Sequence, residues 1–309
     1  MTKLGQCLDD YLSLRRAVGF KLVRQSYILA DFVAFMDRQG ASTVTTPLAV
    51  AWATGTKDSM NWRASRLDAV RSFARYLQAI DASTEVPPAG LLPRCSSRAI
   101  PYIYDDGEVA ALMQATQAIR CRFRRCTYAT LIGLLAVTGM RVGEVIGLDR
   151  DDIHWQHAVL IVRAGKFGKS REVALHPTTV VALADYSRLR DAAIPHPSSS
   201  SFFVSRAGTR LLHENVTCTY RQLVRVAGLR SSSSPRCHPR LCDLRHAFAV
   251  RTVLDWYRDG GAMEPRLPLL STYLGHVDPI STYWYLTATP ELLEQACQRL
   301  RRGCTGGIS

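Results

Sequence analysis

Side chains that suit the chemistry of phosphate esters recur in five short segments of the sequence. In chain order they are Arg141, Lys166, Lys169, Arg171, Arg245, His276 and Tyr285. An arginine guanidinium is a planar cation that matches a phosphate with forked hydrogen bonds, and a tyrosine hydroxyl can act as a nucleophile. Together these residue types could break a phosphodiester bond through a covalent intermediate.

Cleavage of such a bond without a metal ion requires a nucleophile, cations around the five-coordinate phosphorus and a proton donor for the leaving oxygen. We expect Tyr285 to attack the phosphorus, which gives a 3′-phosphotyrosyl link and a free 5′-hydroxyl. Arg141 and Arg245 would hold the non-bridging oxygens, as metal ions do in other enzymes. Because the covalent link conserves the bond energy, the strands could be rejoined without ATP. We therefore expect an enzyme that needs neither a metal, nor ATP, nor a cofactor.

The segments also form an ordered pattern. They are Thr-Gly-Met-Arg-Val-Gly-Glu at 138–144, a basic turn at 165–171, Cys-Asp-Leu-Arg-His at 242–246, Leu-Gly-His at 274–276 and Tyr285. This pattern resembles the tyrosine recombinase (phage integrase) superfamily. No single box is specific, but five in this order are. The residues that flank the tyrosine look most like those of recombinases carried by transposons.

The resemblance implies roles for the remaining residues. Lys166, at the tip of a β-hairpin, would protonate the leaving 5′-oxygen, and His276 would hydrogen-bond the phosphate and help to position it. Lys169 and Arg171 would grip the DNA backbone.

Three assignments stay open from the sequence. Tyr283 is a second choice for the nucleophile, and Lys169 could replace Lys166 as the acid. His246 could touch the site or be an ordinary core histidine.

One position departs from the pattern of the family. Members usually have His or Lys three residues before the second arginine, and this chain has Cys242 there. A thiol is a weak hydrogen-bond donor and a poor acid at its ordinary pKa. The departure supports an alternative function, a DNA-binding accessory protein of the same fold with weak or no cleavage activity. A type IB topoisomerase, which shares the chemistry but acts as a monomer, is a further rival.

Composition agrees with a folded, nucleic-acid-binding protein. The 309 residues are 47% hydrophobic and 21% charged, which is typical of globular chains. The 39 Lys and Arg residues against 26 Asp and Glu residues give a net charge of +13, which favours a polyanionic partner. No stretch has the length of a membrane span, and we find no apolar core of a secretory signal. We expect a cytoplasmic protein with no membrane contact.

The nine cysteines are scattered and contain no C-x-x-C pair, so we expect free thiols in a reducing compartment. Cys237, His238 and Cys242 lie close in sequence, but no second ligand pair lies at zinc-finger spacing. We assign no metal site.

Periodicity predicts a mainly α protein with a small β-sheet. The predicted helices are 4–14, 22–36, 62–80, 107–116, 128–137, 178–190, 215–226, 241–256 and 290–302. Strands at 158–163 and 172–175 would flank the turn at 165–168. The arginines of the third helix, Arg63, Arg66, Arg71 and Arg75, could form a solvated face or follow a phosphate backbone.

Proline, glycine and serine at 86–101 predict a linker. It would separate an all-helical DNA-binding domain, 1–85, from a mixed α/β catalytic domain of the tyrosine recombinase type, 102–309. By resemblance, the partners are double-stranded recombination sites, bound by four protomers on two paired duplexes. We expect a monomer or dimer off DNA, and integration, excision or transposition of a mobile element as the outcome.

Overall fold

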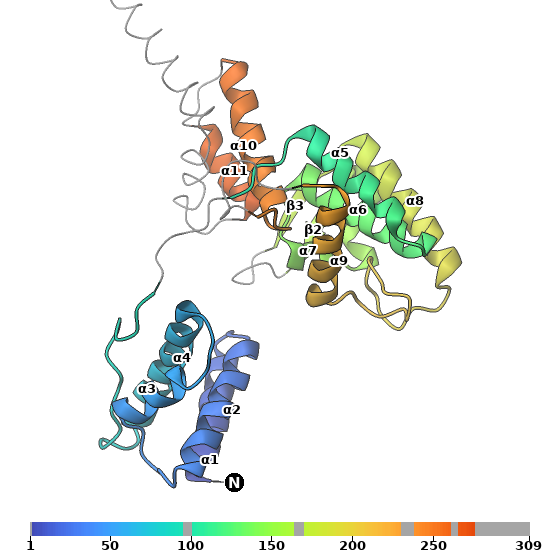
Figure 1. The fold of residues 1–309 in the computed structure, drawn as a ribbon. Helices are drawn as coiled ribbons and strands as arrows, with labels where there is room; N and C mark the ends of the chain where they lie inside the picture. Colours follow the sequence, from blue (N-terminus) through green and yellow to red (C-terminus); the bar gives the residue numbers. More distant parts are fainter. Residues whose placement is uncertain (1, 95–100, 164–169, 230–237, 261–264, 276–309) are drawn as a thin grey trace, which may run out of the picture. The chain divides into compact units, whose positions relative to one another are not determined.

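The computed structural model describes residues 2–94, 101–163, 170–229, 238–260 and 265–275. The chain divides into two compact units, Met1–Arg98 and Ala99–Ser309, which we describe separately. Both units are dominated by helices (Figure 1), so the expected fold class, mainly α with one small sheet, is confirmed.

The described part of the first unit is a set of four helices. They are α1 (Lys3–Ala17), α2 (Val23–Arg38), α3 (Thr46–Thr54) and α4 (Met60–Gln78). Thr2 and Ser59 cap α1 and α4, because each side-chain oxygen accepts a hydrogen bond from a backbone N–H of the first turn. Phe32, Trp52 and Phe73 are buried in the core between the helices. The expected helices 4–14, 22–36 and 62–80 are therefore present, with ends that shift by up to three residues.

The arginines of α4 are mostly engaged within their own unit. Arg66 pairs with Asp31 at 3.1 Å and lies over the Trp52 ring, and Arg63 donates to the Thr56 carbonyl at 2.6 Å. These contacts turn Arg63 and Arg66 inward. The sequence allowed these arginines to form either a solvated face or a face that follows a phosphate backbone. Neither alternative describes Arg63 and Arg66.

Arg71 is also satisfied locally. Its guanidinium donates to the carbonyls of Pro87 and Pro88, each at 2.9 Å. Val86 and Leu92 add partly buried apolar contacts to the same core. Much of the segment we expected to be a linker thus lies along α4 and belongs to the first unit.

The described part of the second unit surrounds one buried helix, α6. Its α-helices are α5 (Asp106–Ala115), α6 (Arg122–Thr138), α7 (Val142–Gly147), α8 (Pro177–Ala193), α9 (His213–Val226), α10 (Asp243–Arg258) and α11 (Arg266–Leu274). Helix α6 contacts α5, α8 and α10, and Figure 1 shows α5, α6 and α8 side by side. It begins six residues before the predicted start because Phe123 and Thr127 extend its buried face.

Three short strands form an antiparallel sheet in the order β1 (Ile153–His154), β2 (Val159–Val162) and β3 (Arg171–Ala174). Val162 pairs with Arg171, so the chain turns back between them, as the predicted hairpin requires. The turn itself, with Lys166 and Lys169, lies outside the described residues.

Helix α11 was not predicted. Pro265 and Pro268 interrupt the local helical pattern, but Pro is compatible with a first helical turn, and Leu267, Leu270 and Leu274 pack against α10. The predicted helix 290–302 lies outside the described residues. Across the helices that are described, none combines the length and apolar character needed to cross a membrane.

Gly139 ends α6 in the left-handed conformation, with φ +59°. A Cβ atom on Gly139 would lie 2.4 Å from Cδ1 of Phe248 and 3.1 Å from Cδ2 of Leu274. Both the backbone angle and the close approach of α10 and α11 therefore require glycine in the Thr-Gly-x-Arg segment.

We predict that Gly139→Ala lowers the free energy of unfolding by about 2–4 kcal/mol, because it combines a disfavoured φ with an overlap in the core. Gly143→Ala is the matched control, since Gly143 lies in α7 with open space around its Cβ position. Urea denaturation of both variants measures the effect. Equal stabilities would show that the α6 end tolerates a side chain.

Candidate active site

The two arginines of the sequence pattern meet at the C-terminal end of α11. Arg141 follows the Gly139 turn and donates through Nη2 to the Gly275 carbonyl at 2.9 Å. Arg245, on the first turns of α10, donates through Nη2 to the Leu274 carbonyl at 2.6 Å. Arg245 also donates through Nη1 to the Gly139 carbonyl at 2.8 Å. Two residues 104 positions apart in the chain therefore bind neighbouring carbonyl groups.

Arg171 of β3 completes this arrangement. Its Nε donates to the Tyr273 carbonyl at 2.8 Å. The last carbonyls of a helix have no partner within the helix and carry partial negative charge. At the end of α11, three successive carbonyls, those of Tyr273, Leu274 and Gly275, each accept a hydrogen bond from a different arginine. We call Arg141, Arg171 and Arg245 the arginine cluster.

Glu144 links two members of the arginine cluster. Its carboxylate accepts from Arg171 through Nη1 at 3.0 Å and Nη2 at 2.7 Å, and from Arg141 through Nη1 at 2.8 Å and the backbone N–H at 2.9 Å. Burial alone would raise the pKa of Glu144, but hydrogen bonds and charge from Arg171 and Arg141 outweigh it and lower the pKa to about 2. Glu144 therefore stays ionised and holds both guanidinium groups.

Gly275 supplies the space for this packing. It ends α11 with φ +68°, and a Cβ atom there would lie 2.9 Å from Nη1 of Arg171. The glycine of the Leu-Gly-His box thus lets an arginine side chain lie against the backbone next to His276.

Cys242 and His246 flank Arg245 at the start of α10, around the fully buried Asp243. Asp243 accepts three hydrogen bonds from Arg240, from the backbone N–H and Nε at 3.0 Å and from Nη2 at 2.8 Å. Loss of solvent around the thiol and the nearby Asp243 carboxylate raise the pKa of Cys242. Cys242 is therefore an uncharged thiol at neutral pH.

The structure brings Arg141, Arg171 and Arg245 together, while Lys166, Lys169, His276, Tyr283 and Tyr285 lie outside the described residues. The side chain of Arg171 is only 13% exposed. A contact between Arg171 and the DNA backbone stays a prediction. In the structure, Arg171 forms an ion pair with Glu144. The sequence pattern alone assigns no role to Glu144, although its position three residues after Arg141 places the two side chains side by side.

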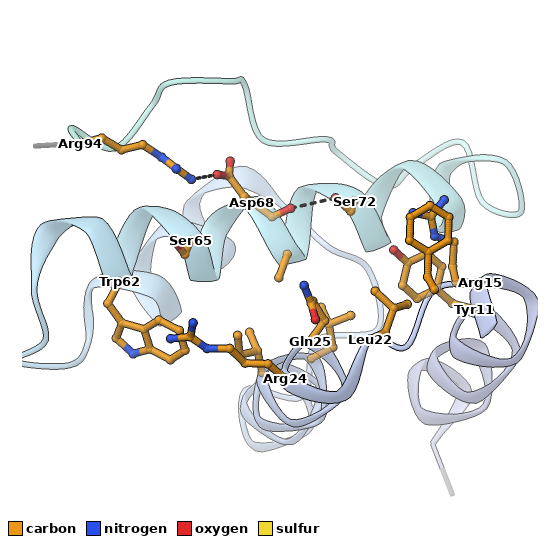
Figure 2. Close-up of a pocket in the computed structure, with 14 residues that line it drawn as sticks. Tyr11, Arg15, Leu22, Arg24, Gln25, Trp62, Ser65, Asp68, Ser72 and Arg94 are labelled. Carbon is orange, nitrogen blue, oxygen red and sulfur yellow. Dashed lines mark hydrogen bonds and ion pairs between the residues drawn. The ribbon is translucent and has the colours of Figure 1, made fainter. Parts of the chain in front are cut away.

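A second basic site lies in the first unit, in a groove of about 440 Å³ between α1, α2 and α4 (Figure 2). Arg15, Arg24 and Arg94 line it, together with Trp62. The Arg24 guanidinium lies 4.1 Å from the centre of the Trp62 ring, and Arg94 pairs with Asp68 at the opposite side. Arginines interleaved with an aromatic ring are typical of surfaces that bind nucleic acid.

We predict that Glu144→Gln removes about 3 kcal/mol of stability at pH 7, and that the difference from the unaltered protein disappears in acid. The pKa of Glu144 in the folded state is about 2, below the ordinary value of 4.5. The ionised carboxylate therefore contributes its full stabilisation of the folded state above pH 4.5 and loses it as the pH falls towards about 2. Urea denaturation between pH 7 and pH 2 measures the difference in the free energy of unfolding. Glu172→Gln, on the exposed face of β3, serves as the control. A difference that does not change with pH would contradict the prediction.

Comparisons with known proteins agree with this geometry. Residues 104–291 match the phage integrase family. The integrase/recombinase protein y4rB of Sinorhizobium fredii is 41% identical, over 98% of each chain. The tyrosine recombinase XerC of Azotobacter vinelandii is 30% identical, over 71% of this chain and 67% of its own.

Solved structures share the fold at lower identity. The integrase of transposon Tn1549 superposes with a TM-score of 0.66 at 17% identity, over 97% of this chain and all of that one. The XerA recombinase gives a TM-score of 0.53 at 22% identity, over 97% and 99% of the two chains. From the motifs in their order, the family match over most of the second unit and the relative that is similar along nearly the whole chain, the protein belongs to the phage integrase family and is a tyrosine recombinase.

Proposed function

We propose that this protein is a site-specific recombinase that cuts and rejoins double-stranded DNA through a 3′-phosphotyrosyl intermediate on Tyr285. The observation that carries the proposal is the convergence of Arg141 and Arg245 on the adjacent carbonyls of Leu274 and Gly275. These hydrogen bonds place the guanidinium groups of Arg141 and Arg245 next to Gly275, the residue that precedes His276. A phosphate at that point would be surrounded by positive charge from two sides.

The proposed reaction is a transesterification. The Tyr285 oxygen forms a bond to the scissile phosphorus as the bond from phosphorus to the 5′-oxygen breaks. The Tyr285 hydroxyl releases its proton to solvent as it attacks, and Lys166 donates a proton to the leaving 5′-oxygen, while His276 hydrogen-bonds the phosphate. Arg141 and Arg245 stabilise the extra negative charge on the non-bridging oxygens. Attack by a 5′-hydroxyl on the phosphotyrosine reverses these steps and joins the strands, without metal or ATP.

The same proposal assigns DNA contacts to both units. The helical residues 1–85 would bind one side of the duplex, with the groove around Arg24 and Trp62 as the contact surface, and residues 102–309 would bind the other. Lys169 and Arg171 would hold the backbone near the cleavage point. The net charge of +13 supports a polyanionic partner for the chain.

Neighbours in structure support the proposed assembly and setting. One is a lambda integrase tetramer bound to a Holliday junction, and another is the Tn1549 integrase in complex with transposon right end DNA. For this protein we propose a tetramer on two paired duplexes and a monomer or dimer off DNA. It would act in the cytoplasm in the integration, excision or transposition of a mobile element.

Cys242 favours a second candidate, an accessory protein that binds the sites but cleaves weakly or not at all. The raised pKa of this thiol removes a possible acid or cation from the position where the family usually has His or Lys. A DNA substrate nicked near the exchange point separates the two candidates, because only a cleaving enzyme becomes trapped as a covalent complex.

We predict that Tyr285→Phe abolishes the covalent complex with the nicked substrate and leaves DNA affinity nearly unchanged, since the substitution removes one oxygen and no charge. Denaturing gel electrophoresis after incubation in EDTA detects the complex, and Tyr283→Phe is the matched control. A complex that survives in Tyr285→Phe but not in Tyr283→Phe would move the nucleophile to Tyr283. Formation only with added magnesium would contradict the metal-independent mechanism.

We predict that Arg245→Lys slows cleavage by about 100-fold or more, because a lysine cannot reproduce the guanidinium fork. The lysine variant keeps a positive charge near the Leu274 carbonyl, so it is preferred to an alanine variant that could unfold. Single-turnover cleavage rates measure the effect. Arg188→Ala, on an exposed position of α8, is the control and should cleave at the unaltered rate. A loss below tenfold would remove Arg245 from the phosphate site.

A further inference from the structure

Three metal-ligand side chains gather at the start of α10. The thiol of Cys242 and Nε2 of His246 each lie 3.9 Å from Oδ1 of Asp243. All three ligand atoms lie within 4.8 Å of one another. The spacing follows from the helix, because residues four apart lie on the same face.

The carboxylate of Asp243 is fixed in place between the other two groups. It is fully buried, and Arg240 holds it with a backbone N–H and two guanidinium hydrogen bonds. A carboxylate oxygen has two lone pairs, so Oδ1 can accept from Arg240 and still bind an ion. Hydrogen bonds of this kind orient the ligands in known metal sites.

The distances suit a tetrahedral ion. Zinc binds thiolate at about 2.3 Å and imidazole nitrogen or carboxylate oxygen at about 2.0–2.2 Å, which separates the ligand atoms by about 3.4–3.6 Å. The two 3.9 Å separations need to close by only a few tenths of an ångström, and the third, between the Cys242 sulfur and the His246 nitrogen, lies within 4.8 Å and needs to close by at most about 1.3 Å. We infer that Cys242, Asp243 and His246 form a binding site for a divalent cation of the zinc class, with the fourth position open to water.

The donor set determines which cations fit. A thiolate and an imidazole favour zinc-class ions over magnesium or calcium, which prefer oxygen ligands. On binding, the Cys242 sulfur forms a bond to the ion and releases its proton to solvent. The positive charges of Arg240 and Arg245 oppose binding, whereas the charge of Asp243 favours it. The proposed cleavage reaction does not use this ion.

The test uses the full-length protein, freed of metal with a chelator that is then removed, and titrated with Co²⁺ alone and then with Zn²⁺. We expect one Co²⁺ per chain, with the absorption band of a thiolate bound to cobalt, and loss of the band when Zn²⁺ is added. Cys242→Ser should remove the band and His246→Gln should weaken Co²⁺ binding at least about tenfold. Cys218→Ser, at an exposed cysteine of α9, is the control and should bind as the unaltered protein does.

A second readout does not depend on the spectrum. Zn²⁺ should raise the unfolding temperature of the unaltered protein and of Cys218→Ser, but not that of Cys242→Ser, since an ion that binds only the folded state stabilises it. If Cys242→Ser does not fold, His246→Gln takes its place in both measurements. Absence of Co²⁺ uptake, or uptake that is unchanged in both Cys242→Ser and His246→Gln, would overturn the inference.

Discussion

The end of α11 is the constraint on which the site depends. The carbonyls of its last two residues, Tyr273 and Leu274, and of the capping residue Gly275 accept hydrogen bonds from Arg171, Arg245 and Arg141. These arginines come from β3, α10 and the turn after α6. The hydrogen bonds to the carbonyls at the end of α11 therefore fix β3, α10 and the turn after α6 relative to this helix. The chain leaves this point at Gly275, so the backbone that leads to His276 starts from a fully specified position.

The same constraint explains how the three guanidinium groups of the arginine cluster can lie close together at the end of α11. A buried guanidinium requires hydrogen-bond acceptors, and the negative end of a helix together with the ionised Glu144 supplies them. Glu144 pairs most directly with Arg171 and Arg141, whereas Arg245 donates to backbone carbonyls. The helix-end carbonyls and Glu144 together therefore allow three guanidinium groups to lie close to one another.

Much of the fold could be predicted from local sequence, and the contacts that build the site could not. Periodicity places most helices and the pairing of β2 with β3, because these depend on residues a few positions apart. It fails at α11, where two prolines hide a helix whose stability comes from packing against α10. The motifs single out Arg141 and Arg245, but the pairing of Arg171 with Glu144 spans 27 residues and appears only in three dimensions.

The residue at position 242 affects which ions the start of α10 can bind. A lysine or a protonated histidine beside Arg245 would add positive charge and repel a metal ion. The thiol of Cys242 is uncharged at neutral pH and lies within a helical turn of His246 and the buried Asp243. The sequence alone did not indicate a metal site, because two of these residues are adjacent and only the fold aims their ligand atoms at one point. A thiol at the position where a cationic side chain is usual thus provides a ligand for the proposed ion, and the proposed reaction relies on Arg141 and Arg245 to bind the phosphate.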